Sequence, residues 1–452
     1  MPPLFDAIVV LLIVVLVARW IKRGSPVLQR YFIPSSLIAG VGGLILGPQL
    51  LGTIPVEVID YWAQMPKHLI SVVFAGLFIG HIIPGPRAIW QQAGPMIAFG
   101  NTLAWGQYVV GIALTLFLLG PMFGAHPLTG ALIEVSFEGG HGTAAGLAPT
   151  FEMLGWPEAT DIALGLATIS IVTMILAGVL MINIHNRMRG QGNNEEAMRK
   201  QQRRMIRSGY SIVKFVSHAS AKPHVVAGHL LLFALAIGIG WLILESFIWL
   251  EAWLLAPHTD LRFFKFVPLF PLAMIGGLII QITLTKAHKT HWVNKRLAGT
   301  ISAISLDVLI LTAISTVSLS VIGDNFPIFI TLAVAGIVWI LAAFFIFAPR
   351  MFKRYWFEQG LTNTGQSMGM TATGLLLNRL VDPTNKSNAR EGFAYKQLAF
   401  EPFMGGGIIT ATAAIVIVTF GQVPALIGAS IIFLFWIWLG LRLGKKRVRR
   451  RS

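Results

Sequence analysis

Two glycine-rich stretches carry the residues most able to do chemistry. Residues 138–147 have the sequence EGGHGTAAGL, and residues 364–375 have the related sequence TGQSMGMTATGL, each between long apolar segments. Gly weakens a helix interior by about 1 kcal/mol relative to Ala. Hydrocarbon cannot satisfy free backbone groups, so a break at membrane depth must be buried in protein or line a watery cavity. We therefore interpret the two stretches as the two halves of a transport site.

The residue types in these stretches suit two kinds of ligand. Backbone N–H groups at the start of a half-helix suit a carboxylate, whereas carbonyl, hydroxyl and carboxylate oxygens suit a hard cation. Small residues that merely permit close helix packing are the alternative interpretation. The expected substrate-binding residues are Gly139, Gly140, His141, Gly142, Thr143, Gln366, Ser367, Gly369, Thr371 and Asn101, and the expected cation-binding residues are Glu138, Thr364, Gly365, Asp307 and Glu134.

Acidic residues in apolar segments are costly and are therefore functional candidates. Glu134 and Glu138 are four residues apart, on one face if helical, and they would act as cation ligands, a proton carrier or a structural ion pair. Asp307 has no partner nearby in the sequence and is expected at an ion site or a gate. Lys396 and Arg379 follow the second glycine-rich stretch, and each would either attract an acidic substrate or be ordinary cytoplasmic charge. Glu401 is expected at a membrane interface.

The composition predicts an all-α polytopic membrane protein. Of the 452 residues, 55% are hydrophobic and 12% are charged, whereas a soluble domain has about 25% charged residues. The net charge of +16 resides mainly in short loops beside apolar segments, which is typical of cytoplasmic loops and not of nucleic-acid binding. The chain has no Cys, so disulfides and thiolate metal sites are excluded, and without a visible P-loop motif the sequence makes no case for direct ATP hydrolysis. We expect no cofactor and no enzymatic activity.

The spacing of apolar segments predicts about eleven membrane spans, with the N-terminus outside and the C-terminus in the cytoplasm, because this puts every basic loop on one side. The second, third and tenth spans are expected at residues 31–52, 68–83 and 402–420. The expected division is 1–30, first span and cytoplasmic turn; 31–184, first repeat with a re-entrant hairpin at about 128–151; 185–224, basic cytoplasmic linker; 225–258, connecting span; 259–420, second repeat with a re-entrant hairpin at about 358–380; and 421–452, last span and basic tail.

Short sequence matches indicate an internal repeat. Residues 143–147 (TAAGL) match residues 371–375 (TATGL) at an offset of 228, and residues 42–45 match residues 276–279 at an offset of 234. The paired spans run in opposite directions through the membrane, so the repeats are expected to be inverted. Such repeats are typical of secondary transporters, whose binding sites lie at the bilayer midplane between broken helices. Chance agreement of short glycine-rich strings is the alternative.

The chain resembles the bacterial sodium/glutamate symporter family over nearly its whole length. The resemblance rests on residues 139–143 (GGHGT), on Ile33-Pro34 followed by Gly40 and Gly43, and on the second glycine-rich stretch. It implies two inverted repeats of about five helices, a re-entrant hairpin in each, and a homodimer in which a transport domain moves against a scaffold. Two positions depart from the family pattern: Glu138 precedes the GGHGT block, and residues 405–411 lack an acidic-plus-amide pair.

The residue pattern predicts a transporter, and the resemblance implies a symporter of the bacterial inner (cytoplasmic) membrane that takes up L-glutamate with Na⁺ as the coupling ion. The nearest alternative is a proton- or sodium-coupled symporter of another small carboxylate, with Glu138 as a proton carrier. A channel or a transport-like sensor is the alternative from another class. The lipid bilayer, the small-molecule substrate and Na⁺ are the expected partners, with no nucleic acid.

Overall fold

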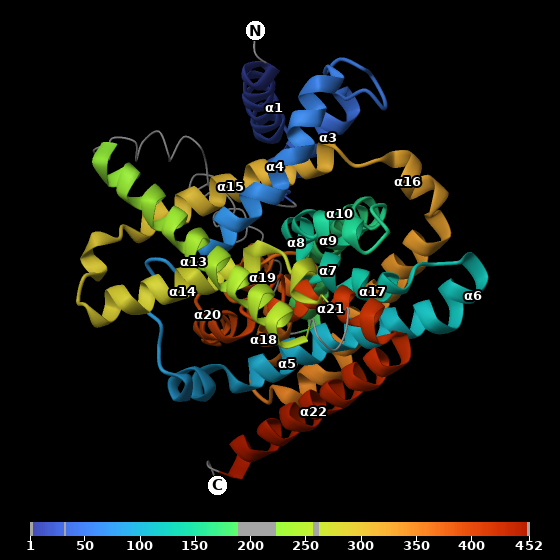
Figure 1. Ribbon diagram of the computed structural model, residues 1–452. Helices are drawn as coiled ribbons and strands as arrows, with labels where there is room; N and C mark the ends of the chain where they lie inside the picture. Colours follow the sequence, from blue (N-terminus) through green and yellow to red (C-terminus); the bar gives the residue numbers. More distant parts are fainter. Residues whose placement is uncertain (1–2, 31–32, 189–222, 256–261, 450–452) are drawn as a thin grey trace.

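The computed structural model describes residues 3–30, 33–188, 223–255 and 262–449, and all regular elements in these ranges are helices (Figure 1). Eight of the described helices are long and apolar enough to cross a membrane. Most of the expected basic linker lies outside the described residues. The eight are Leu4–Gly24, Pro86–Phe123, Ala159–Met188, Pro223–Leu254, Leu269–Lys286, Lys295–Ser315, Phe326–Met351 and Gln422–Lys445.

Three expected spans differ in extent from the helices that form. The second is a short helix between Pro34 and Gly47, and the third begins at Val56, because Pro55 sets its start, and ends at Ala75. The tenth begins only at Ile408, after a turn of three glycines. Hydropathy locates apolar residues but not the Pro and Gly positions that begin and end helices.

The helices form two groups. The first helix group packs around two small apolar cores, one containing Trp62 and the other Phe233. The indole Nε1 of Trp62 donates a 3.0 Å hydrogen bond to the carbonyl of Ala7, which ties the N-terminal helix to this group. Its members are α1 (Pro3–Gly24), α3 (Ser35–Leu46), α4 (Val56–Ala75), α13 (Pro223–Leu255), α14 (Leu269–Lys286) and α15 (Lys295–Ser315), with the short α2 (Pro26–Arg30) beside α1.

The second helix group surrounds one large apolar core that contains Phe99, Phe137, Phe344 and Phe393. In Figure 1, α5 and α22 lie together along one edge of this group, and the short broken helices lie at its centre. Its members are α5 (Pro86–Leu114), α6 (Gly120–Phe123), α7 (Leu132–Phe137), α8 (Gly140–Gly146), α9 (Ala148–Met153), α10 (Ala159–Met188), α16 (Leu319–Asp324), α17 (Phe326–Met351), α18 (Trp356–Ser367), α19 (Thr371–Val381), α20 (Ala389–Phe400), α21 (Ile408–Phe420) and α22 (Gln422–Arg449).

The two groups meet where α8 lies against α4 and α15. A Cβ atom added to Gly142 would lie 3.1 Å from Cδ1 of Ile70, and one added to Gly146 would lie 3.0 Å from Cγ1 of the same residue. Phe270 of α14 is the next neighbour of Gly146, at 3.1 Å. We refer to this contact as the glycine seam. Its small residues allow the backbone of α8 to approach the first helix group closely.

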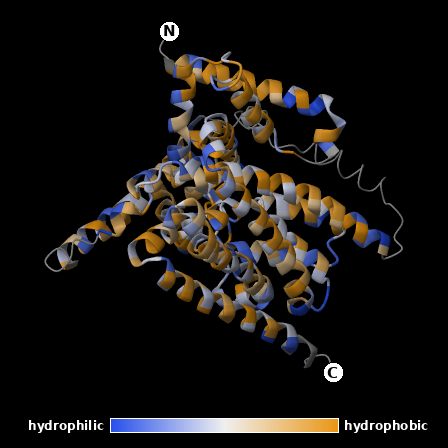
Figure 2. Ribbon diagram, turned by 90° about the vertical axis from the view of Figure 1, so that its right-hand side faces the viewer, coloured by the Kyte–Doolittle hydropathy of each residue, from blue (hydrophilic) through white to orange (hydrophobic). Residues whose placement is uncertain are grey.

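The outer helices are covered with apolar side chains. Figure 2 shows hydrophobic residues along most of their length. On α1, α13 and α22 these include exposed aromatic residues such as Trp20, Trp249 and Trp438. An apolar surface of this extent would be unstable in water but is matched to lipid.

Candidate functional site

Three helix breaks converge in the second helix group. They separate α7 from α8, α18 from α19, and α20 from α21. A Cβ atom added to Gly140 would lie 3.4 Å from the carbonyl oxygen of Gly369, and one added to Gly405 would lie 3.4 Å from the carbonyl oxygen of Glu138. Gly140 and Gly405 have φ values of +68° and +66°, a conformation that only Gly adopts readily.

Small residues also bring α18 and α19 together. A Cβ atom at Gly365 would lie 2.9 Å from the Cα atom of Gly374, so the two backbones are in direct contact. Asn378 Nδ2 of α19 donates a 2.9 Å hydrogen bond to Thr362 Oγ1 of α18. The first turn of α19, at Thr371, has no side-chain cap, which leaves the positive end of this helix available to a ligand.

Glu138 and Gln366 link the first two breaks. Gln366 Nε2 donates a hydrogen bond to Glu138 Oε1, and Gln107 Nε2 of α5 donates a 3.5 Å hydrogen bond to Glu138 Oε2. The positions of Glu138 and Gln366 differ by 228, the same offset that relates the two glycine-rich stretches. Corresponding positions of the two stretches are therefore in contact.

Lys396 of α20 lies behind this pair and is fully buried. Its Nζ atom donates hydrogen bonds of 2.6 Å to Gln366 Oε1 and 2.8 Å to Gln397 Oε1. The same nitrogen lies 3.4 Å from the centroid of the Phe400 ring, where a cation is attracted by the ring face. The sequence suggested that Lys396 attracts an acidic substrate from the cytoplasm or is ordinary cytoplasmic charge. Its ammonium group instead lies inside the protein, so it is not a charge of an exposed loop.

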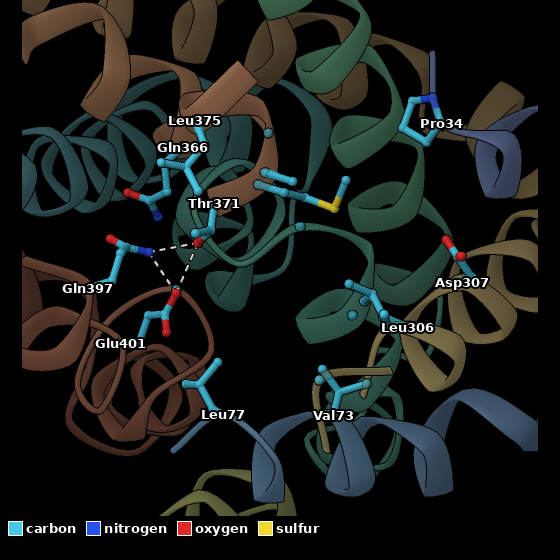
Figure 3. Close-up of a pocket in the computed structure, with 18 of the residues that line it drawn as sticks. Pro34, Val73, Leu77, Leu306, Asp307, Gln366, Thr371, Leu375, Gln397 and Glu401 are labelled. Carbon is cyan, nitrogen blue, oxygen red and sulfur yellow. Dashed lines mark hydrogen bonds between the residues drawn. The ribbon is translucent and has the colours of Figure 1, made fainter. Parts of the chain in front are cut away.

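Gln397 connects Lys396 to a second carboxylate, that of Glu401; Figure 3 shows the bonds that join Gln397, Thr371 and Glu401. Gln397 Nε2 donates to Glu401 Oε1 at 2.6 Å and to Thr371 Oγ1 at 2.7 Å, and the Thr371 hydroxyl donates to Glu401 Oε1 at 2.9 Å. Glu401, which the sequence suggested for a membrane interface, forms part of the third break and contacts the start of α19 through Thr371.

Glu134 is completely buried and binds α7 to two other helices. Its carboxylate accepts a 2.5 Å hydrogen bond from the Tyr108 hydroxyl of α5 and a 2.8 Å hydrogen bond from Thr410 Oγ1 of α21. The backbone N–H of Gly405 donates to the same carboxylate at 3.5 Å. Glu134 thus holds the first and third breaks together.

Several other polar side chains are held inside the second helix group. His141 Nε2 lies 2.9 Å from Thr168 Oγ1, and because this hydroxyl donates its hydrogen to the Leu164 carbonyl, the imidazole Nε2 is the donor. Asn101 Nδ2 bonds the Ile97 carbonyl in its own helix. Among the described residues, Thr143 Oγ1 and Thr364 Oγ1 are buried hydroxyl oxygens without a partner, which is costly unless a ligand completes them.

A cavity of about 1400 Å³ extends from these breaks to the first helix group. Asp307 lies on its far side, opposite Gln366 and Glu401 (Figure 3), where Arg19 and Lys22 of α1 attract it electrostatically. Of the residues expected at the site, the cavity is lined by Glu138, Gly139, Gly140, His141, Gly142, Gln366, Gly369, Thr371 and Asp307. Those that do not line it are Asn101, Glu134, Thr143, Thr364, Gly365 and Ser367.

Sequence reasoning did not place α20 and the turn that follows it at the site: it named Lys396 and Glu401 but did not group them with the hairpins, and it did not single out Gln397. Lys396 and Gln397 are buried, and Glu401 adjoins them. One signal was present in the sequence. Gln397 and Glu401 are four residues apart in an otherwise apolar stretch, which places two polar groups on one helix face.

Comparison with protein families matches a family described as sodium/glutamate symporter to residues 4–376. A search among individual curated proteins found no match. The matched region contains the first two breaks and most of the two helix groups, and it ends before α20, which supplies Lys396 and Gln397. Because the match covers most of the chain and includes the glycine-rich breaks that form the cavity wall, the chain belongs to the sodium/glutamate symporter family.

Proposed function

We propose that the protein couples the entry of Na⁺ to the uptake of L-glutamate by alternating access. Family membership supports the substrate and the ion. The observation that carries the proposal is a concentration of buried negative charge at three broken helices beside a large cavity. No other feature of the described residues combines exposed helix ends, ionisable groups and room for a small ligand.

The charge balance of the site favours binding of a cation. Glu138 and Glu401 share the attraction of a single ammonium group, that of Lys396, and the Glu134 carboxylate adds a third acidic group that is held by Tyr108 and Thr410. If all four groups are ionised, two negative charges remain uncompensated within the second helix group. Buried charge is stable only when it is paired, so one or more Na⁺ ions would stabilise the ionised site. An anionic substrate would then be repelled unless cations enter with it, which couples the two.

The surrounding groups supply distinct contacts for the two ligands. The uncapped start of α19 at Thr371 and the N–H groups of Gln366 suit a substrate carboxylate. Glu138, with the unpartnered hydroxyls of Thr143 and Thr364, suits a sodium ion, since hard cations prefer oxygen ligands. Asp307 lies across the cavity, and it would serve as an ion ligand or a gate only when the two helix groups close on each other.

The arrangement supports an elevator-type movement of the second helix group against the first, with two inverted repeats and two re-entrant hairpins, α7–α8 and α18–α19. Each repeat would place its first helices in the first group and its broken hairpin in the second. We further propose that the protein is a homodimer in the bacterial inner membrane, with its N-terminus outside and its C-terminus in the cytoplasm. The cavity between the helix groups is what such a movement requires.

A second candidate is symport of another small carboxylate, with Na⁺ or protons as the coupling ion. It is favoured by one observation: Lys396, Gln397 and Glu401 all lie beyond the family match. These residues contribute charge and hydrogen-bond donors to the site. Specificity determined by them would therefore differ from that implied by the matched region.

Uptake of radiolabelled L-glutamate into proteoliposomes tests the proposal. An inward Na⁺ gradient, an equal K⁺ gradient and a proton gradient are imposed in turn, with protein-free liposomes as the control. Accumulation with Na⁺ alone is the expected result. Accumulation driven by protons, or competition by other dicarboxylates that exceeds competition by glutamate, would instead support the second candidate. Flux that never exceeds equilibrium would exclude coupled transport.

A further inference from the structure

We propose that Lys396 is a positioning residue that makes the site selective for a carboxylate, by fixing the orientation of the Gln366 and Gln397 amides. The inference rests on the proposed function, because it concerns the substrate of the same site. It adds a specificity determinant from α20, which lies outside the region matched to the family.

The lysine occupies a space that the fold provides for it. Its side chain is completely buried. A Cβ atom added to Gly100 in α5 would lie only 2.6 Å from the Cε atom of Lys396, so the lysine needs a glycine at this position. The Phe400 ring covers one side of the ammonium group, and the oxygens of Gln366 and Gln397 accept its hydrogen bonds. The ammonium is not among the groups that line the cavity. Lys396 therefore acts on a ligand through its neighbours.

The chemistry of an ammonium group determines how both amides are oriented. Lysine has three donors and no acceptor, so the atom of each glutamine that faces Nζ must be the oxygen. The amide nitrogens must then point away from the lysine. Gln366 Nε2 reaches Glu138, and Gln397 Nε2 reaches Thr371 and Glu401, at the wall of the cavity. Without the lysine, either amide is free to rotate and present its oxygen instead.

This orientation gives the site a preference between similar ligands. Gln366 Nε2 has two hydrogens, and within the described part of the chain Glu138 is the acceptor that it reaches. Its second hydrogen suits an oxygen of a substrate carboxylate. A substrate amide has one acceptor oxygen where a carboxylate has two, so its NH₂ group would leave a donor of the site unpaired wherever the carboxylate would use its second oxygen. The lysine thus favours L-glutamate over L-glutamine.

Three variants test this inference. Lys396→Met removes the donor, Lys396→Arg keeps a group with donors only, and Gly100→Ala keeps the lysine but moves its stem. Lys386→Met, at an exposed position between α19 and α20, is the matched control for loss of a positive charge. The readouts are KM and Vmax for L-glutamate uptake and the inhibition of uptake by L-glutamine, together with ligand-induced thermal stabilisation of purified protein.

We expect Lys396→Met to raise the KM for L-glutamate, and to reduce the preference over L-glutamine, by about tenfold or more, because bonds to charged groups are worth about 1.5–3 kcal/mol. Vmax should change by less than about threefold. Lys396→Arg should retain the preference, Gly100→Ala should reduce it partly, and Lys386→Met should leave it unchanged. If Lys396→Met does not fold, Gly100→Ala carries the test.

Two results would overturn the inference. One is an unchanged preference in a folded Lys396→Met protein, or in Gly100→Ala where Lys396→Met does not fold, and the other is a loss of preference in Lys396→Arg equal to that in Lys396→Met. Thermal stabilisation reports binding without transport, so it separates this inference from the proposed function. A wild-type protein stabilised by L-glutamate but not by L-glutamine, and inactive in uptake, would overturn symport and leave the role of Lys396 standing.

Discussion

The two broken helix pairs, α7–α8 and α18–α19, have similar sequences, but the first carries buried carboxylates where the second carries neutral polar side chains. The first contains two buried carboxylates, Glu134 and Glu138, whereas the corresponding positions of the second, at the offset of 228, are Thr362 and Gln366. The pairs share the small residues that follow their breaks, TAAGL at 143–147 and TATGL at 371–375. The breaks themselves differ, because Gly140 has a positive φ whereas Met368, its counterpart at this offset, does not.

This difference suggests a division of labour between the pairs. The acidic pair suits the cation, and the amide and hydroxyl pair suits the substrate. Glu138 and Gln366 are in direct contact, so each ligand would bind next to the other. The lysine lies on the side of the amide pair only, which makes the arrangement asymmetric.

The strongest test of the comparison is to remove the charge from the first pair. Glu138→Gln would make both positions amides while keeping their shape. We expect Na⁺-driven uptake to fall by about 100-fold or more, because a buried charge-assisted contact is lost together with the counter-charge for the cation. Proteoliposome uptake at several Na⁺ concentrations measures the effect. Glu152→Gln, at an exposed position in α9, is the control and should retain full activity.

Exchanging the two side chains tests whether the pairs are equivalent. In the double variant Glu138→Gln/Gln366→Glu, the new carboxylate would face Lys396 directly and form an ion pair with it. We expect Na⁺-driven uptake to stay about tenfold or more below that of the wild type, because the lysine then neutralises the charge that would bind the cation. The dependence of uptake on Na⁺ concentration provides the measurement. Full recovery would mean that the two pairs are interchangeable.

Hydrogen bonds within the two pairs should differ in strength. Tyr108 donates to the Glu134 carboxylate, whereas Asn378 donates to the neutral hydroxyl of Thr362. Tyr108→Phe should lower the free energy of unfolding by about 1.5–3 kcal/mol, and Thr362→Val by about 0.5–1.5 kcal/mol. Urea or thermal unfolding in detergent micelles compares them. Equal losses would indicate that Glu134 is uncharged in the folded protein.

The first break should tolerate no side chain at Gly140. Gly140→Ala forces a left-handed backbone on Ala and should cost about 1–2 kcal/mol in unfolding free energy. Gly323→Ala in α16 is the control, because its φ is not positive and a Cβ atom there meets no atom within 4 Å. The control should be neutral or slightly stabilising. A Gly140→Ala protein as stable as the wild type would show that the left-handed turn is dispensable.

Sequence reasoning located the first two breaks and their polar residues because glycine-rich stretches are conspicuous among apolar spans. It also identified Glu138 and Gln366, which the structure places in contact. The third break was missed, because a hydropathy window averages over residues 401–407. Lys396 was named, but its burial was not predicted, because a lysine that follows a predicted hairpin resembles the many lysines of cytoplasmic loops. Its burial depends on α5 and Gly100, which lie almost 300 residues earlier in the chain.

The glycine seam has a consequence for the speed of the proposed movement. Gly142 and Gly146 present no side chain to Ile70, so this part of α8 lacks the ridges that lock one helix into the grooves of another. Neighbouring registers of such a surface differ little in energy, and passage between them meets a low activation barrier. A methyl group added at Gly146, which packs against Ile70 and Phe270 and does not line the large cavity, would slow turnover while leaving the affinity for both ligands unchanged.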